Sequence, residues 1–111
     1  MEATPLSSRG SAQIRDSKIE AIQRHVARKF GIHVEELNQR SLTRVAVLPR
    51  QMAMYLAKQL TDASLVEIGS HFGGKHHTTV MHSIATIDQL RRVDPTVYLA
   101  VDMFLKTLKR H

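Results

Sequence analysis

Cysteine is absent from the chain, acidic residues are in the minority, and no long hydrophobic run occurs. Without cysteine there is no disulfide framework and no thiolate chemistry. No stretch approaches the roughly 20 apolar residues that a membrane-spanning helix needs, so the sequence predicts no membrane segment. The chain carries 10 Asp and Glu against 16 Lys and Arg, a net charge of +6. This excess suits a polyanionic partner such as nucleic acid.

A length of 111 residues with 42% hydrophobic content corresponds to one domain with a single core. Residues 1–15 are predicted to be a flexible lead-in or linker, because proline, glycine and serine recur there. This segment also lacks the apolar region of a signal peptide, so a cytoplasmic location is expected. Residues 16–111 are predicted to form the folded domain, which is expected to be monomeric when isolated.

Periodic apolar residues predict helices throughout that domain and no sheet. Ser17 with Glu20 three residues later has the pattern of a capping box, and Gly31 is suited to end the helix that follows. A short helical turn is expected over 34–37. The apolar stripes of three longer helices are Ile19, Ile22, Val26 and Phe30, then Met52, Leu56 and Leu60, and finally Val97, Val101, Phe104 and Leu108.

The segment from Asn38 to Leu48 shows no helical period and contains Arg40 and Arg44. We expect a basic loop here, although residues 45–47 could also form a brief strand. Pro49 fits the first position of the next helix, where its missing amide hydrogen costs nothing. From Asn38 to Ile87 there are five Lys and Arg and two acids, so this part of the chain is locally basic.

Residues 64–87 predict two helices joined by a sharp turn. Ser64 and Glu67 form a second capping-box pattern at the start of the first helix. Gly73 and Gly74 can adopt positive φ, which lets the chain turn hard into a second helix. This arrangement is typical of a DNA-binding helix-turn-helix.

The second of these helices has one apolar face, formed by Val80, Ile84, Ile87 and Leu90. Its leading end is polar, with the sequence His76, His77, Thr78 and Thr79. Such an end can touch base edges, and its amide groups favour phosphate. An ordinary helical hairpin with a polar end is the alternative interpretation.

The segment GGKHHTTV closely resembles the signature GGRDHTTV of the DNA-binding domain of DnaA, the bacterial chromosomal replication initiator. The likeness continues from Pro49 to Ile84 and includes IEAIQRHVARKFGIHVEEL from Ile19, about 90 residues in all. The resemblance implies an all-α helical bundle with a helix-turn-helix. It also implies sequence-specific binding of double-stranded DNA at origin boxes during initiation of replication. A helix-turn-helix transcription regulator or a standalone DnaA-like protein is the alternative.

The resemblance further assigns roles to individual residues. His77, Thr78 and Thr79 would lie in the major groove and contact base edges. Arg50, Gln51 and Lys58 would hold the phosphate backbone, and Lys75 stands where the family has arginine, keeping the charge without the bidentate fork.

Two positions depart from the family. Its minor-groove arginine is replaced by Leu42, so Arg40 or Arg44 is expected to take that role. His76 replaces an aspartate. A carboxylate accepts from a cytosine amino group, whereas a neutral imidazole has one donor and one acceptor, so base preference at this position is expected to differ.

Two chemical alternatives compete with DNA binding. Gly69, Gly74 and Lys75 fit the start of a phosphate-binding loop, but His76 follows where Ser or Thr should hold magnesium, and a helix is expected before it instead of a strand. Four histidines, His71, His76, His77 and His82, lie close together but lack the usual zinc-ligand spacing. We therefore predict no enzyme activity, no metal site and no cofactor in this chain, and expect ATP only on a domain outside it.

Overall fold

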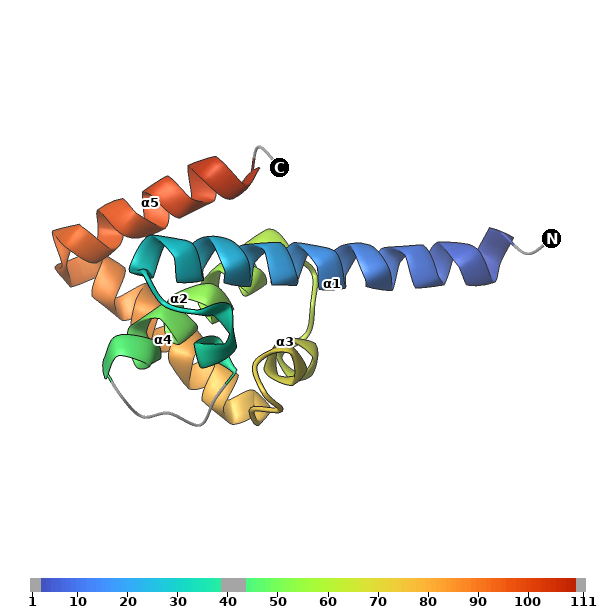
Figure 1. Ribbon diagram of the computed structural model, residues 1–111, viewed down its shortest axis with the longest axis horizontal. Coiled ribbons are helices and arrows are strands. Elements are labelled where there is room, and N and C mark those ends of the chain that lie inside the picture. The colour runs from blue at the N-terminus through green and yellow to red at the C-terminus, as the bar shows by residue number, and fades with distance from the viewer. Residues whose placement is uncertain (1–2, 39–43, 110–111) are drawn as a thin grey trace.

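Helices account for all regular secondary structure in the residues that the computed structural model describes, 3–38 and 44–109. In chain order these are α1 (Ala3–Phe30), the 3₁₀ helix η1 (Val34–Leu37), α2 (Arg44–Leu60), α3 (Leu65–His71), α4 (His77–Val93) and α5 (Pro95–Lys109). Figure 1 shows α2 to α5 gathered around the C-terminal half of α1, whose N-terminal end extends beyond them. The predicted all-α class is confirmed.

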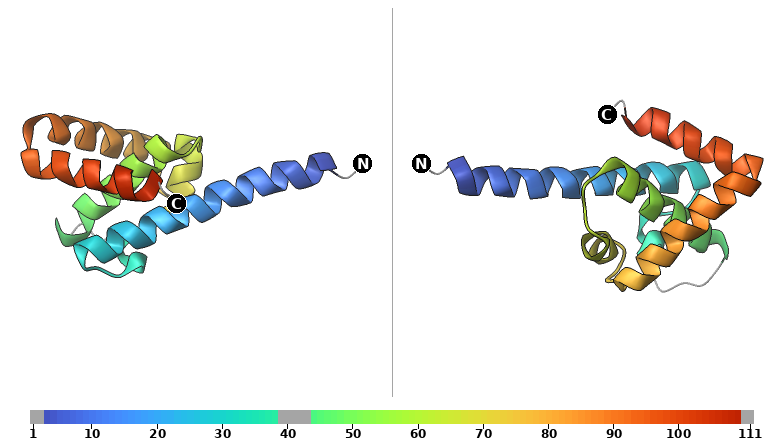
Figure 2. Two further views of the ribbon diagram at one scale, coloured as in Figure 1. Left: turned by 90° about the horizontal axis from the view of Figure 1, so that it is seen from above. Right: turned by 180° about the vertical axis from the view of Figure 1, so that it is seen from behind.

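The core is built around α2, the central helix. Residues 52–57 of this helix are all buried, and a helix that is buried on every side must be surrounded by other elements. It packs against α4, α1 and α5, and less extensively against η1 and α3. The views in Figure 2 show α4 crossing α2 and α5 folding back beside α4. The predicted apolar stripes lie in this core, where Ile22, Val26, Leu56 and Ile87 have no exposed surface.

Helix α1 starts earlier than the sequence predicted. It is continuous from Ala3, so the expected lead-in over residues 1–15 is helical from that residue on, and Ser17 lies inside the helix instead of capping it. The physical reason is a set of tertiary contacts, because Arg15 and Asp16, just upstream of Ser17, form ion pairs with Glu67 and His71 of α3. Gly31, at φ 70°, follows the end of the helix as predicted.

Helix α2 also starts earlier than predicted. It begins at Arg44, five residues before Pro49, so neither the expected loop up to Leu48 nor the alternative strand over 45–47 is correct. A proline at this depth removes the backbone hydrogen bond to the carbonyl of Val45. Burial offsets that loss, since Ala46 is 1% exposed and Pro49 is fully buried. Residues 39–43, which include Arg40 and Leu42, lie outside the described residues.

Helices α4 and α5 are both anchored in the core by buried apolar residues. Helix α4 runs from the turn after α3 across α2, and its Val80 and Ile87 are fully buried. Helix α5 presents Val97, Val101 and Phe104 to the core.

Within the described ranges, no helix has both the length and the apolar character that crossing a bilayer requires.

Candidate nucleic-acid interface

The first helix of the predicted helix-turn-helix, α3, begins at a complete capping box. The amide of Glu67 donates to Ser64 Oγ at 3.1 Å, and the amide of Ser64 donates to Glu67 Oε1 at 2.8 Å. Two amide groups that the first turn would leave without partners are therefore satisfied. The predicted cap is confirmed, and it sets the direction in which the short helix leaves α2.

A glycine-rich turn connects α3 to α4. The carbonyl oxygen of Gly69 accepts from the amides of Phe72 at 3.0 Å and Lys75 at 2.9 Å, which closes the turn. Gly73 and Gly74 have φ values of 75° and 74°, as predicted. A Cβ atom at Gly69 would collide with the carbonyl oxygen of Lys75. Glycine is needed at position 69 because the backbone of the turn comes this close to α3.

The turn delivers the four polar residues 76–79 to the start of α4, and all four are exposed. Val80, the next residue, is fully buried. The boundary between DNA-facing candidates and core thus falls between Thr79 and Val80. His77, Thr78 and Thr79 share one exposed helix end, which is the arrangement that base recognition in a major groove requires.

His76 is the N-cap of α4. Its Nδ1 accepts the amide hydrogen of Thr78 at 3.2 Å and lies 2.8 Å from Thr78 Oγ1. The His76 and His77 rings are neighbours, with centroids 4.3 Å apart and planes at 33°. The sequence predicted exposure of His76 but not its capping role, because histidine is not among the residues that usually cap helices.

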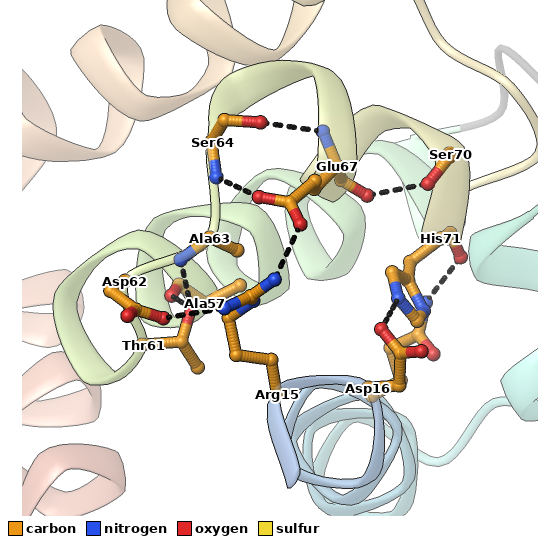
Figure 3. A network of polar contacts seen from close by, with 11 residues as sticks. Arg15, Asp16, Ala57, Thr61, Asp62, Ala63, Ser64, Glu67, Ser70 and His71 are labelled. Atoms are coloured by element: carbon orange, nitrogen blue, oxygen red, sulfur yellow. Dashed lines mark hydrogen bonds and ion pairs between the residues drawn. The ribbon is translucent and has the colours of Figure 1, made fainter. Parts of the chain in front are cut away.

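Polar contacts from α1 hold α3 in place (Figure 3). Arg15 Nη2 donates to Glu67 Oε2 at 2.9 Å, and Arg15 Nη1 is 3.6 Å from Asp62. Asp16 Oδ1 lies 2.9 Å from His71 Nε2 at the other end of α3. The roles of Arg15 and Asp16 were not predicted from the sequence, because contacts between residues more than 50 positions apart leave no local pattern.

Glu67 is held by contacts from two directions. The hydrogen bond from the Ser64 backbone amide is the largest influence and lowers the pKa of the Glu67 carboxyl below 4.5, with smaller contributions from the Ser64 side chain and Arg15. Desolvation, the second-largest influence, raises the pKa and opposes them. The ionised form is therefore the one that joins the α3 cap to α1.

The three cations predicted to bind the DNA phosphate backbone lie in three different environments. Arg50 is only 7% exposed; its Nε donates to the Leu37 carbonyl at 3.3 Å, and burial lowers the pKa of its guanidinium. Lys58 is exposed and donates to the carbonyl of Ala63 at 3.3 Å. Lys75 is half-buried and donates to the carbonyl of Phe72 at 3.0 Å. Lys58, in the last turn of α2, and Lys75, in the turn after α3, thus lie on the two sides of α3, whereas Arg50 connects α2 to η1.

The remaining predicted contacts lie at the start of α2 or outside the described residues. Gln51 is half-buried in α2, and Arg44 is the first residue of that helix. Arg40 is outside the described residues. The assignment of either arginine to a minor groove stays a prediction.

The local structure does not favour the two chemical alternatives. Gly69 lies inside α3 and not in a loop, so the segment lacks the strand and the phosphate-binding loop of an ATPase. Two of the clustered histidines already have other partners, since His71 pairs with Asp16 and His76 caps α4. Among residues 3–38 and 44–109, no three His, Asp or Glu side chains are grouped to hold a metal ion.

Comparison with known proteins relates this geometry to a family. The chain is 42% identical over 102 residues to the chromosomal replication initiator protein DnaA of Agrobacterium fabrum, covering 92% of the chain and 21% of the relative. The protein of that name from Lactobacillus acidophilus is 45% identical over 97 residues, covering 87% and 21% respectively. The protein from Levilactobacillus brevis is 38% identical over 111 residues, covering 99% and 25%. The chain thus spans only about a fifth to a quarter of the length of these relatives.

The family described as the bacterial dnaA protein helix-turn-helix matches residues 19–87. This match begins inside α1, contains α2 and α3 completely, and ends within α4. It therefore includes the capping box, the glycine turn and the exposed residues 76–79 described above. The chain belongs to the bacterial DnaA helix-turn-helix family.

Proposed function

We propose that this chain binds double-stranded DNA sequence-specifically at origin boxes and thereby contributes to initiation of chromosomal replication. The observation that carries the proposal is the exposed polar start of α4, presented by a glycine turn in a chain of this family. The name shared by the relatives, chromosomal replication initiator protein, supports the process. We further propose that the chain acts as a monomeric, non-catalytic DNA-binding module.

In this proposal the start of α4 enters the major groove. A groove about 12 Å wide admits one helix, and the residues at its leading end contact base edges. His77 and Thr79 offer hydrogen-bonding groups, and the threonine methyl groups can contact thymine methyls. Lys58 and Lys75, which flank α3, would neutralise phosphates and set the register of the helix without selecting a sequence.

Basic residues before and within the start of α2 would reach a second groove. A narrow A/T-rich minor groove concentrates negative potential and attracts arginine. Arg44, as the first residue of α2, and Arg40 are the two candidates for this contact. Arg50 is proposed to contribute chiefly by holding η1 against α2, because it is nearly buried.

A helix-turn-helix transcription regulator or a standalone DnaA-like protein would use the same contact chemistry and differ only in its target. A helical module that binds protein is the alternative of a different class. It would have no salt-dependent affinity for duplex DNA. The net charge of +6 and the exposed residues 76–79 favour DNA.

The test is a binding selection from random duplex DNA, followed by titration of the selected duplex at several salt concentrations. Neutralisation of about four or five phosphates by lysines and arginines predicts that log K falls against log salt with a slope of about −4 to −5. A slope near zero would refute DNA binding. A selected box that recurs in promoters but not at replication origins would favour the transcription-regulator alternative.

A further inference from the structure

We infer that His76 determines specificity as a hydrogen-bond donor and discriminates against cytosine, the base that offers no acceptor in the major groove, at one position of the bound duplex. The inference rests on the proposed function, because it places the start of α4 in a major groove. It goes beyond that proposal by assigning the polarity of one contact from the geometry of the protein alone.

The cap of α4 determines which nitrogen of His76 carries hydrogen. A backbone amide can only donate, so the contact from the Thr78 amide at 3.2 Å requires a lone pair on His76 Nδ1. The neutral ring then carries its hydrogen on Nε2. Thr78 Oγ1, 2.8 Å from the same nitrogen, can share this lone pair by donating its hydroxyl hydrogen.

His76 is left with one nitrogen for contacts outside the protein. Thr78 occupies Nδ1, and Nε2 is a donor in this tautomer. Nε2 is also a donor in the doubly protonated ring, so its polarity does not depend on the charge state. The neighbouring His77 ring, with its centroid 4.3 Å away, restricts the orientation of the exposed His76 ring.

A fixed donor discriminates against a base that offers no acceptor in the major groove. Thymine O4, guanine O6 and the N7 atoms of guanine and adenine accept hydrogen bonds there, whereas cytosine presents only its N4 amino group, a donor. A donor that meets an amino group leaves two donors facing each other without an acceptor. An unmade hydrogen bond of this kind costs about 1 kcal/mol or somewhat more, roughly a five- to tenfold change in affinity.

The test uses His76→Asp, a substitution that keeps the cap and reverses the polarity. Aspartate is a favoured N-cap residue, and its ionised carboxylate only accepts. His76→Asn is the matched control, since asparagine also caps well but carries both donor and acceptor groups. Each protein is titrated with variants of its selected duplex in which every position is replaced in turn by the other three bases.

For the unsubstituted protein we expect one position at which cytosine is bound roughly five- to tenfold more weakly than thymine or guanine. His76→Asp should prefer cytosine or adenine at that same position by a similar factor. His76→Asn should lose the preference while retaining binding to the rest of the box. Thermal unfolding of all three proteins should be similar, because all three residues can cap α4.

Three outcomes would overturn the inference. His76→Asp and the unsubstituted protein could show the same preference at every position, or the substitution could weaken all duplexes equally, as the loss of a phosphate contact would. The third is a His76→Asn variant that still discriminates against cytosine as strongly as the unsubstituted protein does. If the unsubstituted protein bound all duplexes equally, the proposed function itself would fail, which separates the two conclusions.

Discussion

Gly73 and Gly74 are adjacent in the turn before α4 and have nearly the same φ, 75° and 74°, yet alanine should have very different effects at the two positions. A Cβ atom at Gly74 meets nothing within 4 Å, whereas a Cβ atom at Gly73 collides with the carbonyl oxygen of Asn38. Gly74→Ala therefore incurs only left-handed backbone strain, about 1 kcal/mol. Gly73→Ala adds the cost of displacing packed backbone, about 1 to 3 kcal/mol more.

Chemical denaturation followed by circular dichroism would measure both free energies of unfolding. We expect a loss of about 1 kcal/mol for Gly74→Ala and about 2 to 4 kcal/mol for Gly73→Ala. Because the shared φ makes Gly74→Ala a matched control for strain, the difference between the variants isolates the contact with Asn38. Equal losses for the two variants would refute the argument that the turn packs closely against the residue following η1.

Two further predictions concern the Glu67 cap of α3 and the residues proposed to contact DNA. The lowered pKa of Glu67 means that its ionised form stabilises the fold at pH values above 4.5, and that this contribution is lost as pH falls through the lowered pKa. Acid unfolding of Glu67→Gln should accordingly depend less on pH in that range, and an unchanged profile would argue against the cap. For DNA, His77→Ala should cost about 1 to 3 kcal/mol on the selected box and little on random duplex, whereas Lys58→Ala should weaken both together. An equal loss on both duplexes for His77→Ala would mark a phosphate contact.

The parts of the fold that the sequence predicted well are those determined by local chemistry. The α3 capping box needs only Ser64 and Glu67 three residues apart, and the turn needs only glycines that tolerate positive φ. The apolar stripe of α4 followed from its helical period, with Val80 and Ile87 fully buried. Each of these features is encoded within a few neighbouring residues.

The parts that were predicted wrongly depend on distant contacts. Pro49 was expected to start α2, but burial of Ala46 and of the proline itself accompanies a helix that begins at Arg44. The extension of α1 upstream of Ser17 coincides with ion pairs to Glu67 and His71, more than 50 residues away. Residues 3–16 contain no periodic pattern that would indicate contacts with Glu67 or His71.

In the candidate site, too, some features follow from local sequence and others depend on the fold. Residues 76–79 were predicted to contact DNA from their place after the glycine turn, and the structure shows that they are exposed beside the buried Val80. Arg50 was grouped with the phosphate-binding cations from family likeness, and only the fold places it against the carbonyl of Leu37. Sequence identifies which residue types stand at the interface, but burial decides which of them a ligand can reach.

The geometry of the turn explains how base preference can change without loss of the fold. The angle between α3 and α4 is set by backbone groups, since the Gly69 carbonyl accepts from the amides of Phe72 and Lys75. The side chains of residues 76–79 do not take part in those bonds and are exposed. His76 contributes to the fold only through its cap, a role that aspartate and asparagine can also fill. Substitution among these three residues can therefore alter the donor or acceptor presented to DNA while the helix that carries it stays in place.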